Sequence, residues 1–183
     1  MSSETMEFLP LRRNSSQRSM AIANYFRKLG YGHILLGCLA VSLQIAVTVM
    51  ACLYYGLYAW NWDAPTLAKS SMGICSGTVA IILGALQIDA GAILRKSSRA
   101  NVDDRFCAIK MLNCLSALFA LLVLGISVYL LYILMQWLNV EDEMYRRFQN
   151  GPVAVGVVLN SAQGLVAVLE VVLSILGVAM RDF

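Results

Sequence analysis

The sequence predicts an all-α fold, a left-handed bundle of four transmembrane helices. Hydrophobic residues make up 59% of the 183 positions and charged residues only 14%, whereas a soluble domain carries about 25% charged residues. The hydrophobic residues fall into four long blocks, and the charges lie between the blocks. Small and polar residues recur every three or four positions within the blocks, which is typical of helices that pack against each other in a membrane.

Each block is long enough to cross a bilayer, because a spanning helix needs about 20 apolar residues. The expected spans are residues 34–58, 71–94, 111–138 and 152–180. The first and third contain no formal charge, and the second and fourth contain one acid each, Asp89 and Glu170. We therefore expect one transmembrane domain, residues 31–183, preceded by a tail of residues 1–30.

The distribution of Lys and Arg predicts the orientation. Eleven of the 14 lie in the tail, in the loop between the second and third spans, and after the fourth span. Basic residues favour the cytoplasmic side, so both termini and the middle loop are expected in the cytoplasm. This basic side should attract anionic lipid headgroups. The tail contains no apolar stretch typical of a signal peptide, so the first span should act as the insertion signal.

The tail leaves two interpretations open. Residues 1–15 are polar and are expected to be irregular. Residues 16–29 form either a short amphipathic helix in the headgroup region or a plain polar leader. Arg12-Arg13-Asn14-Ser15 matches a basophilic kinase pattern, so Ser15 is a candidate phosphorylation site, with a chance match as the alternative.

The two expected outer loops differ in composition. The loop at 58–65 contains Tyr58, Trp60 and Trp62, and such side chains favour the membrane interface, so they are interpreted as an anchoring belt. The loop at 139–151 mixes acidic and basic residues and is expected to be a solvated cap. Neither loop contains Cys, which excludes an outer domain held by disulfides.

Cys107 lies where the middle loop meets the third span. Cysteines at such positions can be palmitoylated. The alternative is a buried small side chain.

Small and polar residues define one face of each span. The fourth span shows the pattern most completely, in Gly156, Asn160, Gln163, Ala167, Glu170, Ser174 and Gly177. The first helix shows a similar spacing in His33, just before its span, and in Gly37 and Gln44 within it. The second span carries four glycines on one face, Gly73, Gly77, Gly84 and Gly91. Glycine lets helix backbones approach closely, so these four are expected to make the tightest helix contact.

The polar residues inside the spans are the candidate functional residues: Gln44, Asp89, Asn160, Gln163 and Glu170. An acid at the bilayer centre costs about 2.5–3.5 kcal/mol and needs a partner. Glu170 is either part of an ion or proton path, or a neutral group that shares a hydrogen bond with Gln44 or another amide. Asp89 lies near the end of its span and is expected to be solvated and paired with Arg95 or Lys96.

Catalytic and metal-binding patterns are missing from the sequence. His33 is the only histidine and the cysteines are scattered, so no metal-ligand cluster is expected. Phosphate-binding glycine loops and nucleophile elbows are absent as well. We expect a protein that is not an enzyme, needs no cofactor and has no nucleic-acid partner.

Several short motifs resemble the membrane-spanning four-domain subfamily A. Leu36-Gly37 followed by Gln44-Ile45 resembles the opening of that family's first helix, and Ser76-Gly77 looks like part of its second. Val168-Leu169-Glu170, followed by Ser174, is similar to a stretch of its fourth helix. The resemblance covers residues 30–180, and the Cys pair of some members is missing from the second outer loop. It implies an oligomeric, non-enzymatic tetraspan that modulates receptors or calcium entry.

The expected function is therefore that of a scaffold or accessory subunit. It would contact membrane lipids, self-associate, and bind receptor or channel subunits through its helix faces. The expected location is the plasma membrane, with an endomembrane as the alternative. A small ion channel or transporter that uses Gln44, Asp89 and Glu170 is the second hypothesis, and a structural tetraspan of an organelle membrane is the third.

Overall fold

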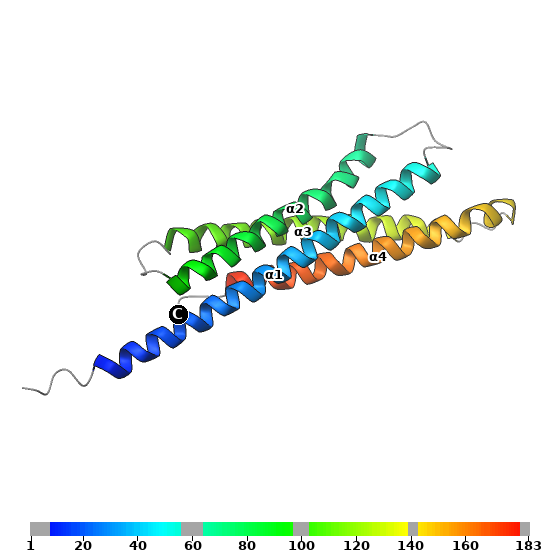
Figure 1. Ribbon diagram of the computed structural model, residues 1–183. Coiled ribbons are helices and arrows are strands. Elements are labelled where there is room, and N and C mark those ends of the chain that lie inside the picture. Colours follow the sequence, from blue (N-terminus) through cyan, green and yellow to red (C-terminus); the bar gives the residue numbers. More distant parts are fainter. Residues whose placement is uncertain (1–7, 56–63, 97–102, 139–142, 180–183) are drawn as a thin grey trace, which may run out of the picture.

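Four helices make up the described part of the chain (Figure 1). A computed structural model describes residues 8–55, 64–96, 103–138 and 143–179. The helices are α1 (Phe8–Tyr55), α2 (Ala64–Lys96), α3 (Asp103–Leu138) and α4 (Glu143–Ala179). The expected all-α bundle is confirmed, and the expected aromatic belt at 58–62 lies outside the described residues.

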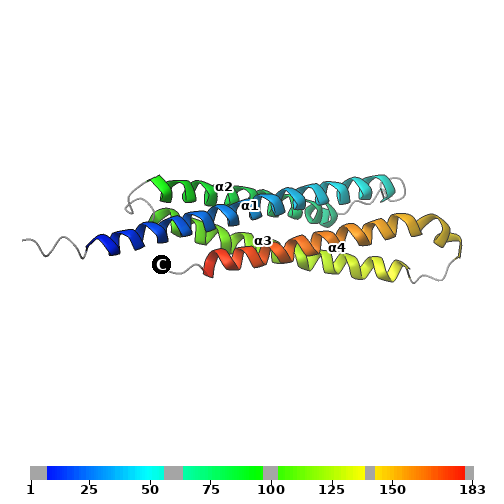
Figure 2. The ribbon, with the colours of Figure 1, turned by 60° about the horizontal axis from the view of Figure 1, so that its bottom comes forward.

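Each helix contains a segment long and apolar enough to cross a membrane. The segments are Met20–Met50, Met72–Arg95, Cys107–Tyr132 and Ala154–Ala179. Successive helices run in opposite directions, so the start of α1 and the end of α4 lie at the same end of the bundle (Figures 1 and 2). The chain is thus a four-span membrane protein, and the cytoplasmic location of this end stays a prediction.

All four helices begin before the expected spans, and α1 begins earliest relative to its span. α1 starts at Phe8 and runs without interruption into the first span. The prediction of an irregular tail over residues 1–15 is therefore wrong from Phe8 onward. Pro10 falls in the first turn, where its missing N–H breaks no helical hydrogen bond. α4 starts at Glu143, so most of the expected cap at 139–151 is helical.

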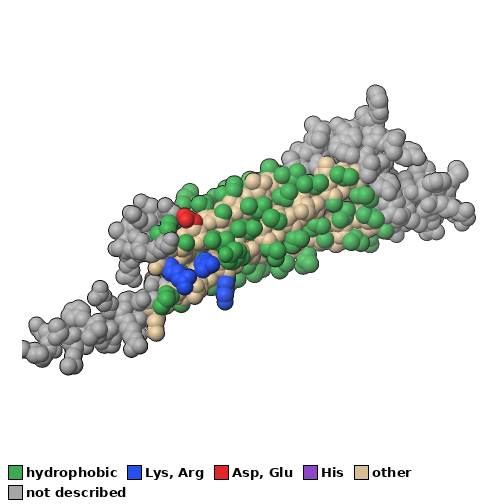
Figure 3. Space-filling model, in the orientation of Figure 1, with side chains coloured by type: hydrophobic (Ala, Val, Ile, Leu, Met, Phe, Trp, Pro, Cys, Tyr) green, Lys and Arg blue, Asp and Glu red, His purple; other side chains and the backbone are tan. Residues whose placement is uncertain are grey.

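The interior of the bundle follows a repeat of three and four residues. Along α3 the buried positions are Ile109, Asn113, Ser116, Ala120, Val123 and Ser127. This spacing is typical of helices that pack with a left-handed twist. The outward positions are instead large and apolar, with Met111 69% exposed and Val158 66% exposed. Figure 3 shows this apolar surface along the bundle, with Lys and Arg gathered toward one end.

The four helices divide into two closely packed pairs. α1 with α2, here called the N-terminal pair, and α3 with α4, the C-terminal pair, make the most extensive contacts. The contacts of α1 with α4 and of α2 with α3 are less extensive. Each pair is therefore the tight unit of the fold, and a looser interface joins the two units.

Glycines set the spacing within the N-terminal pair. A Cβ placed at Gly84 would lie 2.5 Å from the carbonyl oxygen of Gly30, and one at Gly37 would lie 2.6 Å from that of Gly77. Real Cβ atoms essentially never approach backbone oxygens so closely. Further along, a Cβ at Gly91 would meet the Ala23 carbonyl oxygen at 2.8 Å. Only glycine allows the two backbones to approach this closely. The resulting van der Waals contact stabilises the helix pair, because lipid supplies no hydrophobic drive for helices to associate.

A substitution pair tests this glycine contact. Gly84→Ala should lower the free energy of unfolding by about 1–3 kcal/mol, because the added methyl meets backbone rather than a movable side chain. The matched control is Gly125→Ala on α3, where a Cβ would meet nothing within 4 Å. The measurement is unfolding in detergent. Equal stability of the two variants would contradict the close contact.

Candidate functional site

The centre of the bundle is a buried acid that contacts two other helices. Glu170 on α4 is 3% exposed, and its Oε1 lies 2.6 Å from Nδ1 of His33 on α1. The hydroxyl of Ser116 on α3 donates to the same oxygen at 2.6 Å. His33 and Ser116 are themselves completely buried. One carboxyl oxygen thus ties three of the four helices together.

This geometry corrects the expected partner of Glu170. Gln44 or another amide was the expected partner, but the structure gives Glu170 a histidine and a serine instead. The neutral state of the Glu170 carboxyl stays a prediction, and the histidine beside it was not expected as a partner. The first span was taken to begin at residue 34, whereas the apolar segment of α1 begins at Met20 and includes His33. The sequence did contain a signal that His33 faces the bundle interior, because His33 is the first residue in the repeat of small and polar residues in α1.

Gln44 belongs to a second polar contact. The amide nitrogen of Gln163 on α4 donates to Oε1 of Gln44 at 3.1 Å. Both side chains are buried. Gly73 of α2 lies against this pair, because a Cβ there would collide with both amides. Gly73 therefore makes room for a hydrogen bond, unlike Gly77 and Gly84, which make room for backbone.

A third polar contact joins α2 to α3. The amide nitrogen of Gln87 donates to Oδ1 of Asn113 at 3.3 Å, and Asn113 donates to the Ile109 carbonyl at 2.8 Å. Gly177 of α4 leaves space for the Asn113 side chain. Gln87 was not singled out from the sequence. The signal was its spacing, because Gln87 lies three positions after Gly84 and four positions before Gly91 and so shares their helical face.

The three contacts share one structural role. His33–Glu170 and Gln44–Gln163 link α1 to α4, and Gln87–Asn113 links α2 to α3. Each of them therefore joins the N-terminal pair to the C-terminal pair. The helix pairs pack internally through small residues, and the interface between the pairs is held by polar side chains.

The remaining candidate residues lie apart from these contacts. Asp89 is exposed on α2, and its pairing with Arg95 or Lys96 stays a prediction. Asn160 is buried and donates to the Gly156 carbonyl of its own helix at 2.8 Å. Ser15 falls within α1, but its side chain lies outside the described residues.

Cys107 is exposed on α3. The interpretation of Cys107 as a buried small side chain is therefore wrong. Palmitoylation of this cysteine stays a prediction.

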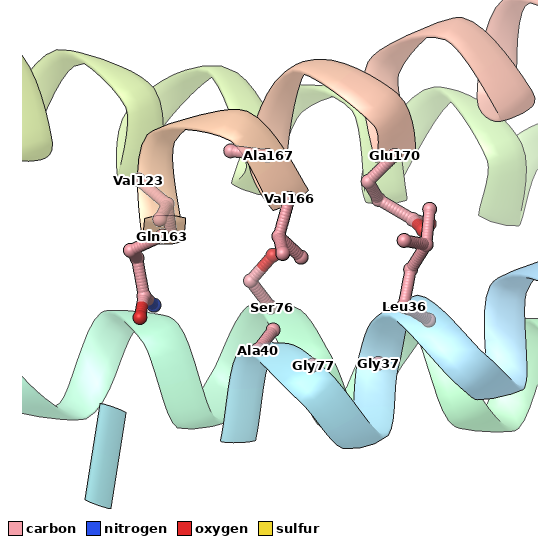
Figure 4. Close-up of a pocket in the computed structure, with 11 residues that line it drawn as sticks. Leu36, Gly37, Ala40, Ser76, Gly77, Val123, Gln163, Val166, Ala167 and Glu170 are labelled. Atoms are coloured by element: carbon pink, nitrogen blue, oxygen red, sulfur yellow. The ribbon is translucent and has the colours of Figure 1, made fainter. Parts of the chain in front are cut away.

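A small cavity lies between the two helix pairs, beside these contacts (Figure 4). Its volume is about 10 Å³, and all four helices contribute to its wall. The polar groups of the wall belong to Ser76, Gln163 and Glu170. The space is close to that of a single water molecule.

The chemistry available to this arrangement is hydrogen bonding and proton exchange within the His33–Glu170 pair. A buried acid beside an imidazole is far less costly than a lone charge in a membrane. Among the residues that the structure describes, no group of three or more His, Cys, Asp or Glu side chains could hold a metal ion. The arrangement most directly supports helix association.

Comparison with known proteins gave no match, either to a protein-family model, to a curated protein or to a solved structure.

Substitutions at Glu170 test the role of its carboxyl group. Glu170→Gln keeps an oxygen that can accept from Ser116 and His33, so the loss of stability should stay below about 1 kcal/mol. Glu170→Leu removes the acceptor from two buried groups and should cost about 1–3 kcal/mol. Glu170→Lys should fail to fold, because it sets an ammonium beside the imidazole.

The measurement is the free energy of unfolding in detergent for each variant. Val168→Leu serves as a control, since Val168 is exposed on the same helix. A Glu170→Gln protein that is as unstable as Glu170→Leu would contradict the acceptor role.

Proposed function

We propose that this four-span protein is a non-enzymatic scaffold or accessory subunit, which self-associates and binds receptors or channels through its outer helix faces. The observation that carries the proposal is the separation of polar from apolar side chains. Residues that could serve chemistry, such as Gln44, Gln163 and Glu170, are bonded to neighbouring helices. What the bundle presents outward is an apolar surface on all four helices, and this surface is suited to lipid and to other transmembrane helices.

The resemblance to the membrane-spanning four-domain subfamily A supports the same proposal. The residues that carry it are residues of helix contact in this chain. Leu36 is buried, Gly37 packs against the backbone of α2, and Gln44 accepts a bond from α4. Glu170 joins α1, α3 and α4. Residues in these roles hold helices together, which is what a scaffold requires.

Gly125 suggests where a partner helix would approach. It is exposed on α3, and a Cβ there would meet nothing within 4 Å. Glycine on an outer face permits close contact with another helix. The flanking side chains Leu121, Leu122 and Val128 are large, apolar and exposed. We place the homo-oligomeric contact on this face of α3.

The location and orientation of the protein belong to the same proposal. We infer a plasma-membrane protein, with an endomembrane as the alternative, and cytoplasmic termini. The support for the orientation is the concentration of Lys and Arg toward the end of the bundle where α1 begins and α4 ends, because basic residues favour the cytoplasmic side.

A small ion channel or transporter is the second candidate. The observation in its favour is the buried pair of His33 and Glu170, since ionisable groups inside a membrane often serve transport. Its three proposed residues do not meet, however. Gln44 bonds to Gln163, Glu170 bonds to His33, and Asp89 is exposed on α2.

The test of the scaffold is isolation from cells in mild detergent, followed by cross-linking and mass spectrometry. We expect a homo-oligomer that retains receptor or channel subunits. Gly125→Leu should weaken self-association with little change in stability, because the new side chain blocks the close approach. The matched control is Ser161→Leu, at an exposed position of α4.

Two results would contradict the proposal. One is a purified protein that stays monomeric at high concentration and retains no partner. The other is an ion flux in liposomes that Glu170→Gln abolishes without loss of folding, which would favour the channel.

A further inference from the structure

Basic side chains gather on the outside of the bundle, toward the end where α1 begins. Figure 3 shows them over α1 and the end of α2. Arg27 on α1 is half-buried, whereas Lys28 on α1 and Arg95 on α2 are exposed. None of these three side chains takes part in the hydrogen bonds that join the helix pairs. The assembly of the bundle therefore does not account for them.

The close packing of α1 on α2 positions two of these cations. A Cβ placed at Gly91 would lie 2.9 Å from Cγ of Arg27, so the aliphatic stem of Arg27 lies against the α2 backbone at this glycine. Arg95 follows Gly91 by four positions, which turns it only about 40° around the helix. Arg27 and Arg95 therefore lie along the same junction of α1 with α2. Together with Lys28 they are here called the basic junction.

The acid of α2 closest to this junction in sequence lies on another face of the helix. Asp89 precedes Gly91 by two positions and Arg95 by six, which places it about 160° and 120° away from them around the helix. It is exposed on that other face. Side chains on one helix meet when they are three or four positions apart, so Asp89 is poorly placed to neutralise Arg95.

The basic junction lies at a surface of the membrane. The apolar segment of α1, Met20–Met50, has 31 residues, whereas a span needs about 20. The part of this segment after Lys28 is long enough to cross the bilayer alone. On α2 the apolar segment ends at Arg95. The cations therefore lie at the level of the phospholipid headgroups.

An apolar strip continues from the basic junction toward the membrane interior. Tyr31 and Leu35 follow Lys28 by three and seven positions, so the three side chains share one face of α1. Tyr31 is 56% exposed and Leu35 is 64% exposed. A cation followed by an outward apolar strip matches a phospholipid, because its charged headgroup and its acyl chains follow each other in the same order.

We propose that the basic junction binds one anionic phospholipid whose headgroup carries a phosphate monoester. The guanidinium groups of Arg27 and Arg95 donate to phosphate oxygens, which they can do in a bidentate manner. Lys28 adds a third positive charge, and an acyl chain lies along Tyr31 and Leu35. Three cations favour a headgroup with more than one negative charge. The site is thus a discrete one on the N-terminal pair, beyond a general attraction of the basic end to anionic lipid.

An acidic segment of a soluble protein is the competing occupant. It would match the charges of the basic junction, but it would make no use of the apolar strip below them. The exposed side chains of Tyr31 and Leu35 therefore favour a lipid, which contacts both parts of the surface at once.

Native mass spectrometry tests the selectivity for lipid. The whole protein, freed of lipid in a neutral detergent, is titrated separately with phosphatidylinositol monophosphate, phosphatidylserine and phosphatidylcholine. We expect one molecule of the phosphatidylinositol monophosphate to bind most tightly and phosphatidylcholine to bind most weakly. Equal affinity for the three lipids would overturn the proposal, and so would equal affinity for the first two.

Substitutions distinguish the basic junction from the general charge of this end. Arg27→Gln and Arg95→Gln should each weaken binding of the phosphatidylinositol monophosphate about fivefold, as expected for one cation at a membrane surface. The matched control is Lys110→Gln, which removes the same charge from α3, a helix without extensive contact with α1. This control should bind as the wild type does.

Equal weakening by all three substitutions would overturn the discrete site. The midpoint temperature of unfolding is measured for each variant, because Arg27 also packs against Gly91. Arg95 is exposed, so Arg95→Gln keeps the test decisive if Arg27→Gln is unstable. Wild-type affinity in a folded Arg95→Gln protein would contradict the assignment.

A soluble headgroup distinguishes a lipid site from a site for free phosphate compounds. Inositol bisphosphate is added to the protein with bound phosphatidylinositol monophosphate. We expect it to displace little lipid at an equal concentration, because it has no acyl chain to lie along Tyr31 and Leu35. Displacement as effective as that by the lipid itself would overturn the assignment to a lipid.

Discussion

The structure depends on one constraint, namely that the membrane interior offers no water to a polar group. Glu170 lies in the middle of the apolar segment of α4 and is buried. Its carboxyl group must therefore find its partners inside the protein, and it finds them on two other helices, at His33 and Ser116. The position of α1 and α3 relative to α4 follows from that requirement. An apolar bundle of the same shape would have no equivalent reason to prefer one axial register.

Two kinds of contact divide the task of assembly. Glycines bring α1 and α2 together along three successive heptads, at Ala23–Gly91, Gly30–Gly84 and Gly37–Gly77. Polar side chains then join the N-terminal pair to the C-terminal pair. The first kind relies on close packing and the second on hydrogen bonds, which are the two forces left when lipid removes the hydrophobic drive. Over the described residues the outer surface is mostly large and apolar, which suits a protein whose proposed role is association in the membrane.

The sequence predicted the fold and much of the interior, but not the pairing. The spacing of apolar and small residues predicted four helices, and the same spacing selected Gln44, Gln163 and Glu170, all of which are buried. The periodicity of a sequence shows which face of a helix is buried, but it does not show the axial register between neighbouring helices. Gln44 or another amide was therefore expected to bond to Glu170, whereas the structure places Gln44 opposite Gln163 and His33 opposite Glu170. The start of α1 was missed for another reason, because polar residues beyond the membrane leave no hydropathy signal.

A double-mutant cycle between His33 and Glu170 tests the central claim most directly. The free energy of unfolding in detergent is measured for His33→Leu, for Glu170→Leu and for the double variant. If the pair joins α1 to α4, the two changes should be non-additive by about 0.5–3 kcal/mol, as for residues in contact. The parallel cycle of Gln44→Leu with Glu170→Leu should be additive, because Gln44 bonds to Gln163 instead. Additivity in the His33 cycle, or coupling in the Gln44 cycle, would contradict the account.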